Sequence, residues 1–157
     1  MRRLSDRALA EIETARREED SARHALLTAL RVVQEERRQV GPDEVVQIAA
    51  LLSLSPATVE GVARFYDQIS EEATGRQVLS LCRGISCQLC GADPLAREVL
   101  DNLGIEDGGR TQDGSLTVRL VECIGNCDQA PTGMLDTAFV GPLTSTVLSE
   151  LLTRWRR

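Results

Sequence analysis

The sequence has no lysine, one histidine and only four aromatic residues among its 157 residues. One histidine, His24, cannot form a histidine-rich metal site or a pair of catalytic histidines. Four aromatic side chains do not supply the base-stacking platform that single-stranded nucleic acid requires. The formal net charge of −6 also argues against a nucleic-acid partner, because phosphate groups bind to basic surfaces.

Long apolar segments are absent as well. No stretch approaches the roughly 18 consecutive apolar residues of a membrane-spanning helix. Met1 is followed by residues of mixed charge and not by the apolar core of a signal peptide. We therefore expect a cytoplasmic protein without direct membrane insertion, which a complex could hold at the inner face of the plasma membrane. The length and the 42% hydrophobic content fit one globular domain or two small ones.

Cysteine is the distinctive residue of this chain. All five cysteines lie in the second half, in a first cluster of Cys82, Cys87 and Cys90 and a second cluster of Cys123 and Cys127. An odd number of cysteines in a cytoplasmic protein argues against a disulfide framework. Two tight clusters separated by a long segment are typical of metal ligands.

The first half is expected to be helical. Apolar residues recur at helical spacing over residues 1–40 and predict two helices, with Asp20-Ser21 as the cap between them. Asp43 is expected to cap a third helix, over residues 44–52.

A fourth helix is expected after Ser55-Pro56, because Ser is favoured at the N-cap and Pro at the first helical position. This helix runs to about residue 69, and Phe65 and Tyr66 near its end are expected to pack in the core. Residues 1–73 are therefore predicted to form a small helical bundle.

The hydrophobic period changes after Gly75, and residues 76–157 are expected to form an α/β domain. A strand over residues 77–81 leads into Cys82, and a strand over residues 116–121 leads to Cys123. The other elements predicted here are a helix over 94–103, a strand over 132–140 and a helix over 144–155. The fold class is α+β, with both cysteine clusters in loops that follow strands.

The two cysteine loops suit an iron–sulfur cluster. Such a cluster is held by four thiolates on loops whose backbone comes close to the inorganic sulfides. Gly84 and Gly125, one inside each loop, permit that approach because they lack a side chain.

Two ligand sets are compatible with the spacing. One combines Cys82, Cys87 and Cys90 with one distant cysteine, as in plant-type ferredoxins. The other uses two pairs, Cys82 with Cys87 and Cys123 with Cys127. We favour the two pairs, because they leave only Cys90 unused, at a position where a small buried residue at the start of a helix is expected.

The two pairs, Cys-x4-Cys and then Cys-x3-Cys, resemble the motif of the thioredoxin-like 2Fe–2S ferredoxins of respiratory complex I. The most similar stretch covers residues 121–131, Val-Glu-Cys-Ile-Gly-Asn-Cys-Asp-Gln-Ala-Pro. Residues 47–49, 59–62 and 65–66 resemble the helical segment of that family. The resemblance extends over about residues 22–157 and leaves residues 1–20 outside. Cys90 and the Arg-Gly-Ile-Ser interior of the first motif depart from the family, so hydrogen bonding around the cluster is expected to differ.

The resemblance implies an N-terminal helical segment over residues 1–73 that docks on a partner, followed by a thioredoxin-like domain over residues 76–157. It implies one 2Fe–2S cluster, with Cys82, Cys87, Cys123 and Cys127 as cofactor-binding ligands. The implied partner is a flavoprotein subunit that carries FMN, the NADH site and a 4Fe–4S cluster, within a larger respiratory complex. The chain is then the electron-transfer subunit of an NADH:quinone oxidoreductase, without a complete active site of its own.

Other functions remain open at this point. Relatives of the same subunit serve NAD-linked formate dehydrogenases and NAD-reducing hydrogenases. Four thiolates also suit a structural zinc site, although zinc loops usually carry Cys-x2-Cys pairs. A thioredoxin-type redox pair at Cys87 and Cys90 is a weaker alternative. The peptide bond before Pro131 is equally compatible with the cis and the trans form.

Overall fold

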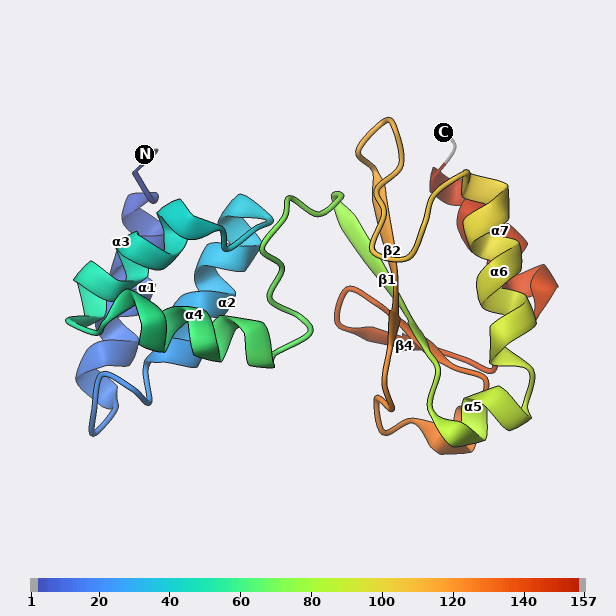
Figure 1. The fold of residues 1–157 in the computed structure, drawn as a ribbon, viewed down its shortest axis with the longest axis horizontal. Coiled ribbons are helices and arrows are strands. Elements are labelled where there is room, and N and C mark those ends of the chain that lie inside the picture. Colours follow the sequence, from blue (N-terminus) through green and yellow to red (C-terminus); the bar gives the residue numbers. More distant parts are fainter. Residues whose placement is uncertain (1–2, 156–157) are drawn as a thin grey trace. The chain divides into compact units, whose positions relative to one another are not determined.

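The computed structural model describes residues 3–155 and divides into two compact units, Met1–Ala73 and Thr74–Arg157. Each unit has its own buried apolar core. The α+β fold class predicted from the sequence is confirmed, because the first unit is helical and the second contains a mixed sheet with helices (Figure 1).

Four helices make up the first unit: α1 (Asp6–Glu18), α2 (Leu26–Arg37), α3 (Pro42–Leu52) and α4 (Pro56–Phe65) (Figure 1). Each helix turns an apolar face inward. The largest fully buried side chains of this unit are Leu26, Leu30, Val33, Val40, Ile48, Leu52 and Val59. The predicted helical bundle is present, and its core is aliphatic.

The helix starts agree in part with the sequence prediction. Ser55 caps α4, since its hydroxyl oxygen accepts the N–H of Thr58 at 3.1 Å. The prediction of Asp43 as a cap is wrong, because α3 begins at Pro42, its N-cap position is Gly41, and Asp43 lies inside the helix. There the Glu44 carboxylate accepts the N–H of Gly41 at 3.1 Å. The prediction of a cap at residues 20–21 is also wrong, because the N-cap position of α2 is Ala25 and no described side chain caps that helix.

The aromatic pair at the end of α4 is not in the core. Phe65 is 78% exposed and Tyr66 is 39% exposed, so the expectation that they pack inside is wrong. The buried face of α4 is formed by Val59 and Ala63, and the chain becomes extended at Tyr66. The two rings contact each other edge to face, with centroids 5.2 Å apart.

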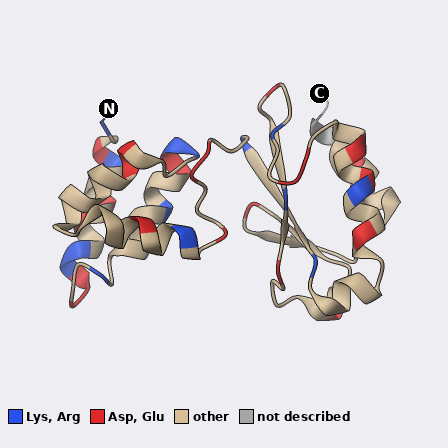
Figure 2. Ribbon diagram, in the orientation of Figure 1, with Lys and Arg blue, Asp and Glu red and all other residues tan. Residues whose placement is uncertain are grey.

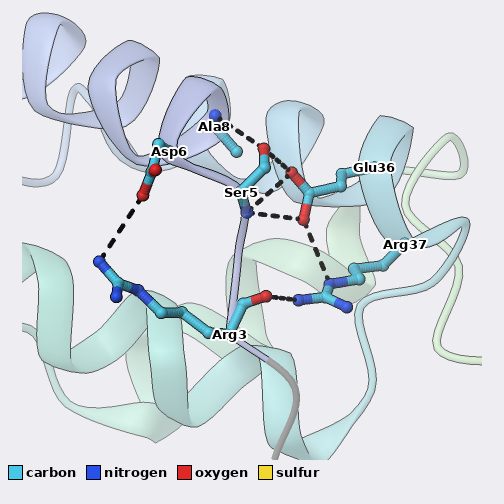
Figure 3. A network of polar contacts seen from close by, with 6 residues as sticks. All are labelled: Arg3, Ser5, Asp6, Ala8, Glu36 and Arg37. Atoms are coloured by element: carbon cyan, nitrogen blue, oxygen red, sulfur yellow. Dashed lines mark hydrogen bonds and ion pairs between the residues drawn. The ribbon is translucent and has the colours of Figure 1, made fainter.

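The start of α1 is tied to the end of α2 by a polar network (Figure 3). The N–H of Ser5 donates to the Glu36 carboxylate at 3.1 and 3.2 Å, and the Ser5 hydroxyl donates to the same carboxylate. The Ser5 hydroxyl oxygen also accepts the N–H of Ala8 at 3.2 Å and thereby caps α1. The buried Arg37 guanidinium donates to the carbonyl of Arg3 and lies 3.5 Å from Glu36.

None of the described helices is by itself long and apolar enough to cross a membrane. Helices α3 and α4 reach the required length and composition only when taken together, and they are bent by 117° at the break between them.

The second unit contains a four-stranded sheet in the order β2-β1-β3-β4. Its elements are β1 (Gln77–Cys82), α5 (Ile85–Leu89), α6 (Ala92–Leu103), β2 (Leu116–Val121), the 3-10 turn η1 (Cys127–Gln129), β3 (Gly133–Leu135), β4 (Ala138–Val140) and α7 (Ser145–Trp155). β1 and β2 are parallel, and the other two pairings are antiparallel. Helices α6 and α7 lie beside each other, and α6 contacts β1 (Figure 1).

The core of the second unit lies between the sheet and these two helices. It includes Leu79, Leu81, Val99, Leu116, Val118, Leu143 and Leu148. Leu116, Val118 and Leu120 pack in one core, as the sequence predicted, although Thr117 between them is buried as well. The predicted strand over 132–140 is instead a hairpin, because the chain turns at Asp136, which has a left-handed backbone conformation (φ 51°).

Candidate functional site

The parallel pairing of β1 with β2 brings the two cysteine loops together. Cys82 is the last residue of β1 and lies opposite Val121, the last residue of β2. The N–H of Arg83 donates to the carbonyl of Val121 at 2.9 Å, which extends the pairing by one residue. Because neighbouring parallel strands end at the same edge of a sheet, the loop after Cys82 starts beside the loop that holds Cys123.

The first loop contains a short helix that the sequence analysis did not predict. Helix α5 (Ile85–Leu89) carries Cys87, which is 1% exposed, and Cys90 follows at its end. Cys90 is exposed, so the expectation of a buried small residue there is wrong. A five-residue helix has too few residues for a clear hydrophobic period, which is why the pattern did not reveal it.

Four of the five thiols form one group. The Sγ atoms of Cys123 and Cys127 are 3.6 Å apart. The Cys87 thiol interacts with those of Cys82 and Cys127, and the Cys123 thiol interacts with that of Cys82. Cys82 and Cys87 are buried, whereas Cys123 and Cys127 are exposed. The structure therefore brings together the four residues of the two-pair hypothesis.

Backbone N–H groups point at the sulfur atoms. The N–H of Gly84 donates to Cys82 Sγ at 3.4 Å. The N–H of Gly125 lowers the pKa of Cys123, and the left-handed conformation of Gly125 (φ 81°) is one that residues with side chains rarely adopt. The hydrogen bond with Cys123 raises the pKa of Cys127.

Two opposing effects act on the pKa of the buried Cys87 thiol. Burial raises its pKa, and the backbone N–H of Thr132, which hydrogen-bonds the sulfur, offsets part of that rise. The Ser86 hydroxyl hydrogen-bonds Cys127 in the opposite loop, and this bond offsets part of the rise in the pKa of Cys127. Neither Thr132 nor Ser86 was identified as a site residue from the sequence. Ser86 lies inside the first motif and offered a signal, but Thr132 lies outside both motifs.

The four grouped thiols match the donors that a two-iron cluster requires. A 2Fe–2S cluster takes four thiolates, two for each iron, and its negative charge is balanced by N–H donors. Cys82, Cys87, Cys123 and Cys127 could supply those thiolates, and Gly84, Gly125 and Thr132 supply N–H groups.

The charged neighbours of the second loop are solvated. Glu122 and Asp128 flank the pair Cys123 and Cys127, and both side chains are exposed. The peptide bond between Ala130 and Pro131 is cis, which decides between the two forms that the sequence left open.

Comparisons with known proteins agree with this site. Residues 10–156 match the family model described as thioredoxin-like [2Fe-2S] ferredoxin. The match begins at residue 10, so it includes part of the segment that the sequence analysis placed outside the resemblance.

Several relatives share about a third of their residues with this chain. In Salmonella typhimurium, the NADH-quinone oxidoreductase subunit named E is 34% identical over 145 residues, which are 92% of this chain and 87% of that protein. The protein of the same name in Pseudomonas aeruginosa is 34% identical over 95% of this chain and 90% of that protein. NADH-quinone oxidoreductase subunit 2 of Thermus thermophilus is 36% identical over 87% of this chain and 76% of that protein.

A similar fold occurs in an NAD+-reducing [NiFe]-hydrogenase in the air-oxidized state. The TM-score is 0.71 at 22% identity, and the match covers 83% of this chain but only 22% of the hydrogenase chain. At this identity the similarity concerns the fold alone. The family match over almost the whole length, together with the four grouped thiols, identifies this chain as a member of the thioredoxin-like [2Fe-2S] ferredoxin family.

Proposed function

We propose that this chain is the electron-transfer subunit of an NADH:quinone oxidoreductase, the counterpart of the relatives named E. The observation that carries the proposal is the set of four thiols on two adjacent loops, in a chain similar over nearly its full length to proteins of that name. When bound, one 2Fe–2S cluster accepts and donates a single electron, which is the chemistry that this subunit contributes.

The residues proposed to hold the cluster are Cys82, Cys87, Cys123 and Cys127. Cys82 and Cys87 belong to a small buried apolar cluster with Ala92, which excludes water from one side of the site. Cys123 and Cys127 are exposed and place the other side at the surface, where a partner can approach. The N–H groups aimed at the sulfurs stabilise the negative charge that an added electron brings.

The proposed partner is a flavoprotein that holds FMN, the NADH site and a 4Fe–4S cluster. Helix α5, beside the thiols, has no charged residue (Figure 2) and exposes Ile85 (78%) and Leu89 (84%). Exposed apolar side chains next to a redox group suit a protein contact, since covering them removes water from the site. We propose that α5 docks on the flavoprotein.

The helical unit, residues 1–73, is proposed as a second docking segment. Its exposed Phe65 and Tyr66 form an aromatic pair on the surface, and aromatic residues are enriched in protein interfaces. Assembly into the complex then holds the chain at the cytoplasmic face of a membrane through other subunits.

The same role in an NAD-reducing hydrogenase is the second candidate. The shared fold of the hydrogenase chain supports it. The respiratory complex is favoured, because the relatives named for it reach 34% identity over most of both chains.

The direct test is electron transfer from NADH. The iron-loaded chain is mixed with the FMN-containing flavoprotein subunit of the NADH:quinone oxidoreductase from the same organism, and reduction by NADH is followed by EPR. We expect NADH to reduce the cluster only when the flavoprotein is present. If dithionite reduces the cluster but NADH together with the flavoprotein does not, the assignment to this complex is overturned.

A further inference from the structure

Thr132 contacts the first cysteine loop through its backbone. Its side chain is buried (1% exposed), and the residue lies between Pro131 and β3. Its carbonyl accepts the N–H of Cys82 at 3.1 Å, and its own N–H hydrogen-bonds the sulfur of Cys87. Both residues of the first ligand pair are therefore held by one residue that lies far from them in the sequence.

The side chain of Thr132 contacts the second cysteine loop. Its hydroxyl oxygen accepts Nδ2–H of Asn126 at 2.8 Å, and its hydroxyl hydrogen donates to the carbonyl of Val140 at 3.0 Å. Asn126 immediately precedes Cys127. The hydrogen-bonded chain Asn126–Thr132–Val140 therefore fixes the second loop to strand β4.

The surroundings leave the hydroxyl little freedom. A Cβ at Gly141 would lie 2.8 Å from Thr132 Oγ1 and 3.1 Å from Thr132 Cβ. The backbone at Gly141 thus packs directly against the Thr132 side chain. In this buried position a lost hydrogen bond leaves the Asn126 amide and the Val140 carbonyl without their partner.

We propose that Thr132, together with Asn126, is a positioning residue that sets the relative placement of the two thiol pairs. The inference rests on the proposed function, since it concerns the cluster held by those pairs. Thr132 joins the two loops through four hydrogen bonds, two from its backbone and two from its hydroxyl group. It touches the ligands and their neighbours without being a ligand.

The consequence is a property of the bound cluster and not only of the fold. Groups that orient metal ligands typically change metal affinity or activity by about 10- to 100-fold when they are replaced. If the hydroxyl is removed, Asn126 no longer holds the second loop, and the N–H of Thr132 moves relative to Cys87. A weaker hydrogen bond to the sulfur disfavours the reduced, more negative state, so the reduction potential becomes more negative.

The test compares two buried threonines of the same unit. Thr132→Val removes the hydroxyl and keeps the shape. Thr117→Val is the matched control, because Thr117 is also buried (4% exposed) and accepts one N–H, from Gly75 at 2.9 Å, at the end of β2 away from Cys123. Thr132→Ser retains the hydroxyl. For each variant, we would measure the rate of iron loss to a chelator, the midpoint potential by EPR-monitored titration, and the thermal midpoint.

Thr132→Val is expected to lose iron about tenfold faster than wild type and to show altered EPR g values and a more negative potential. Thr117→Val is expected to lower the thermal midpoint while keeping the wild-type g values and potential, and Thr132→Ser is expected to restore them. Adding Asn126→Ala to Thr132→Val is expected to have little further effect, because both changes break the same hydrogen bond.

Two results overturn the inference in distinguishable ways. If the wild-type chain binds a cluster and Thr132→Val keeps its g values, potential and rate of iron loss, the positioning role is refuted and the proposed function stands. If the anaerobically purified wild-type chain binds no cluster, the proposed function fails, and the inference fails with it.

Discussion

Gly84 and Cys123 are in direct contact across the two cysteine loops, so that a Cβ on Gly84 would lie 3.0 Å from the Cβ of Cys123 and 3.2 Å from its Cα. It would also lie 3.4 Å from Cys82 Sγ. The absence of a side chain at Gly84 is therefore what allows the two thiol pairs to face each other.

The variant Gly84→Ala is expected to push the loops apart. Overpacking of this kind costs about 1–3 kcal/mol of stability, and the iron content is expected to fall as well. Gly61→Ala is the control, because no atom lies within 4 Å of a Cβ at this exposed position in α4. Replacing a glycine within a helix is expected to leave stability unchanged or raise it by up to about 1 kcal/mol. Urea denaturation measures the change in stability, and iron analysis measures the cluster content. Full iron content in Gly84→Ala would contradict the expected separation of the loops.

The two proposed ligand sets differ at Cys90, and the plant-type set also leaves one of Cys123 and Cys127 unused. Cys127→Ser is expected to abolish the visible absorption of the cluster, because the oxygen of serine is a poor replacement for a thiolate in this pair. Cys90→Ser is expected to leave the spectrum intact, since Cys90 is exposed at the end of α5. The opposite pattern would establish the plant-type set with Cys90 as a ligand.

Docking through α5 predicts a loss of electron transfer without loss of the cluster. Leu89→Asp, alone or with Ile85→Asp, places a charge in the proposed contact with the flavoprotein. NADH-dependent reduction at limiting partner concentration is expected to slow by about tenfold, which corresponds to ~1.4 kcal/mol of binding energy. Reduction by dithionite serves as the control and is expected to be unchanged. A wild-type rate with NADH would show that α5 is not part of the contact.

The turn before β2 predicts a pH dependence of stability. Asp113 accepts hydrogen bonds from the Thr111 hydroxyl at 2.6 Å and from the N–H and hydroxyl of Ser115 at 3.0 and 2.8 Å. The Thr111 hydroxyl, followed by the two Ser115 donors, lowers the pKa of Asp113 from its ordinary 3.8 to about 2.

Because this pKa is lower in the folded chain than in the unfolded chain, Asp113 stabilises the fold at pH values above about 4, and that contribution disappears as the pH falls towards 2. In Asp113→Asn the contribution is absent at every pH. The difference in urea midpoint between wild type and variant is therefore expected to shrink between pH 5 and about 2. A difference that stays constant over this interval would contradict the assignment.

The sequence predicted which four thiols lie together, because the relevant signal is local. Each cysteine pair lies within a few residues, each loop has its glycine, and the strands before them have a clear period. The packing of Leu116 and Val118 in the core could be predicted from the pattern of β2 alone. These features do not depend on how distant segments pack.

The missed features depend on contacts between distant segments. Thr132 is next to neither motif, and its role follows from the pairing that places it between Cys82 and Asn126. Phe65 was expected in the core, but the buried face of α4 is formed by Val59 and Ala63, and Phe65, the last residue of the helix, is exposed. The hairpin within residues 132–140 turns at Asp136, whose left-handed conformation no glycine signalled.

The proposed function requires that this chain holds one 2Fe–2S cluster. The most direct measurement is the iron, acid-labile sulfide and zinc content of the anaerobically purified chain, with EPR after reduction by dithionite. The account predicts about two irons and two sulfides per chain and the EPR signal of a reduced two-iron cluster. About one zinc per chain, without sulfide and without a signal, would contradict it and establish a structural zinc site instead.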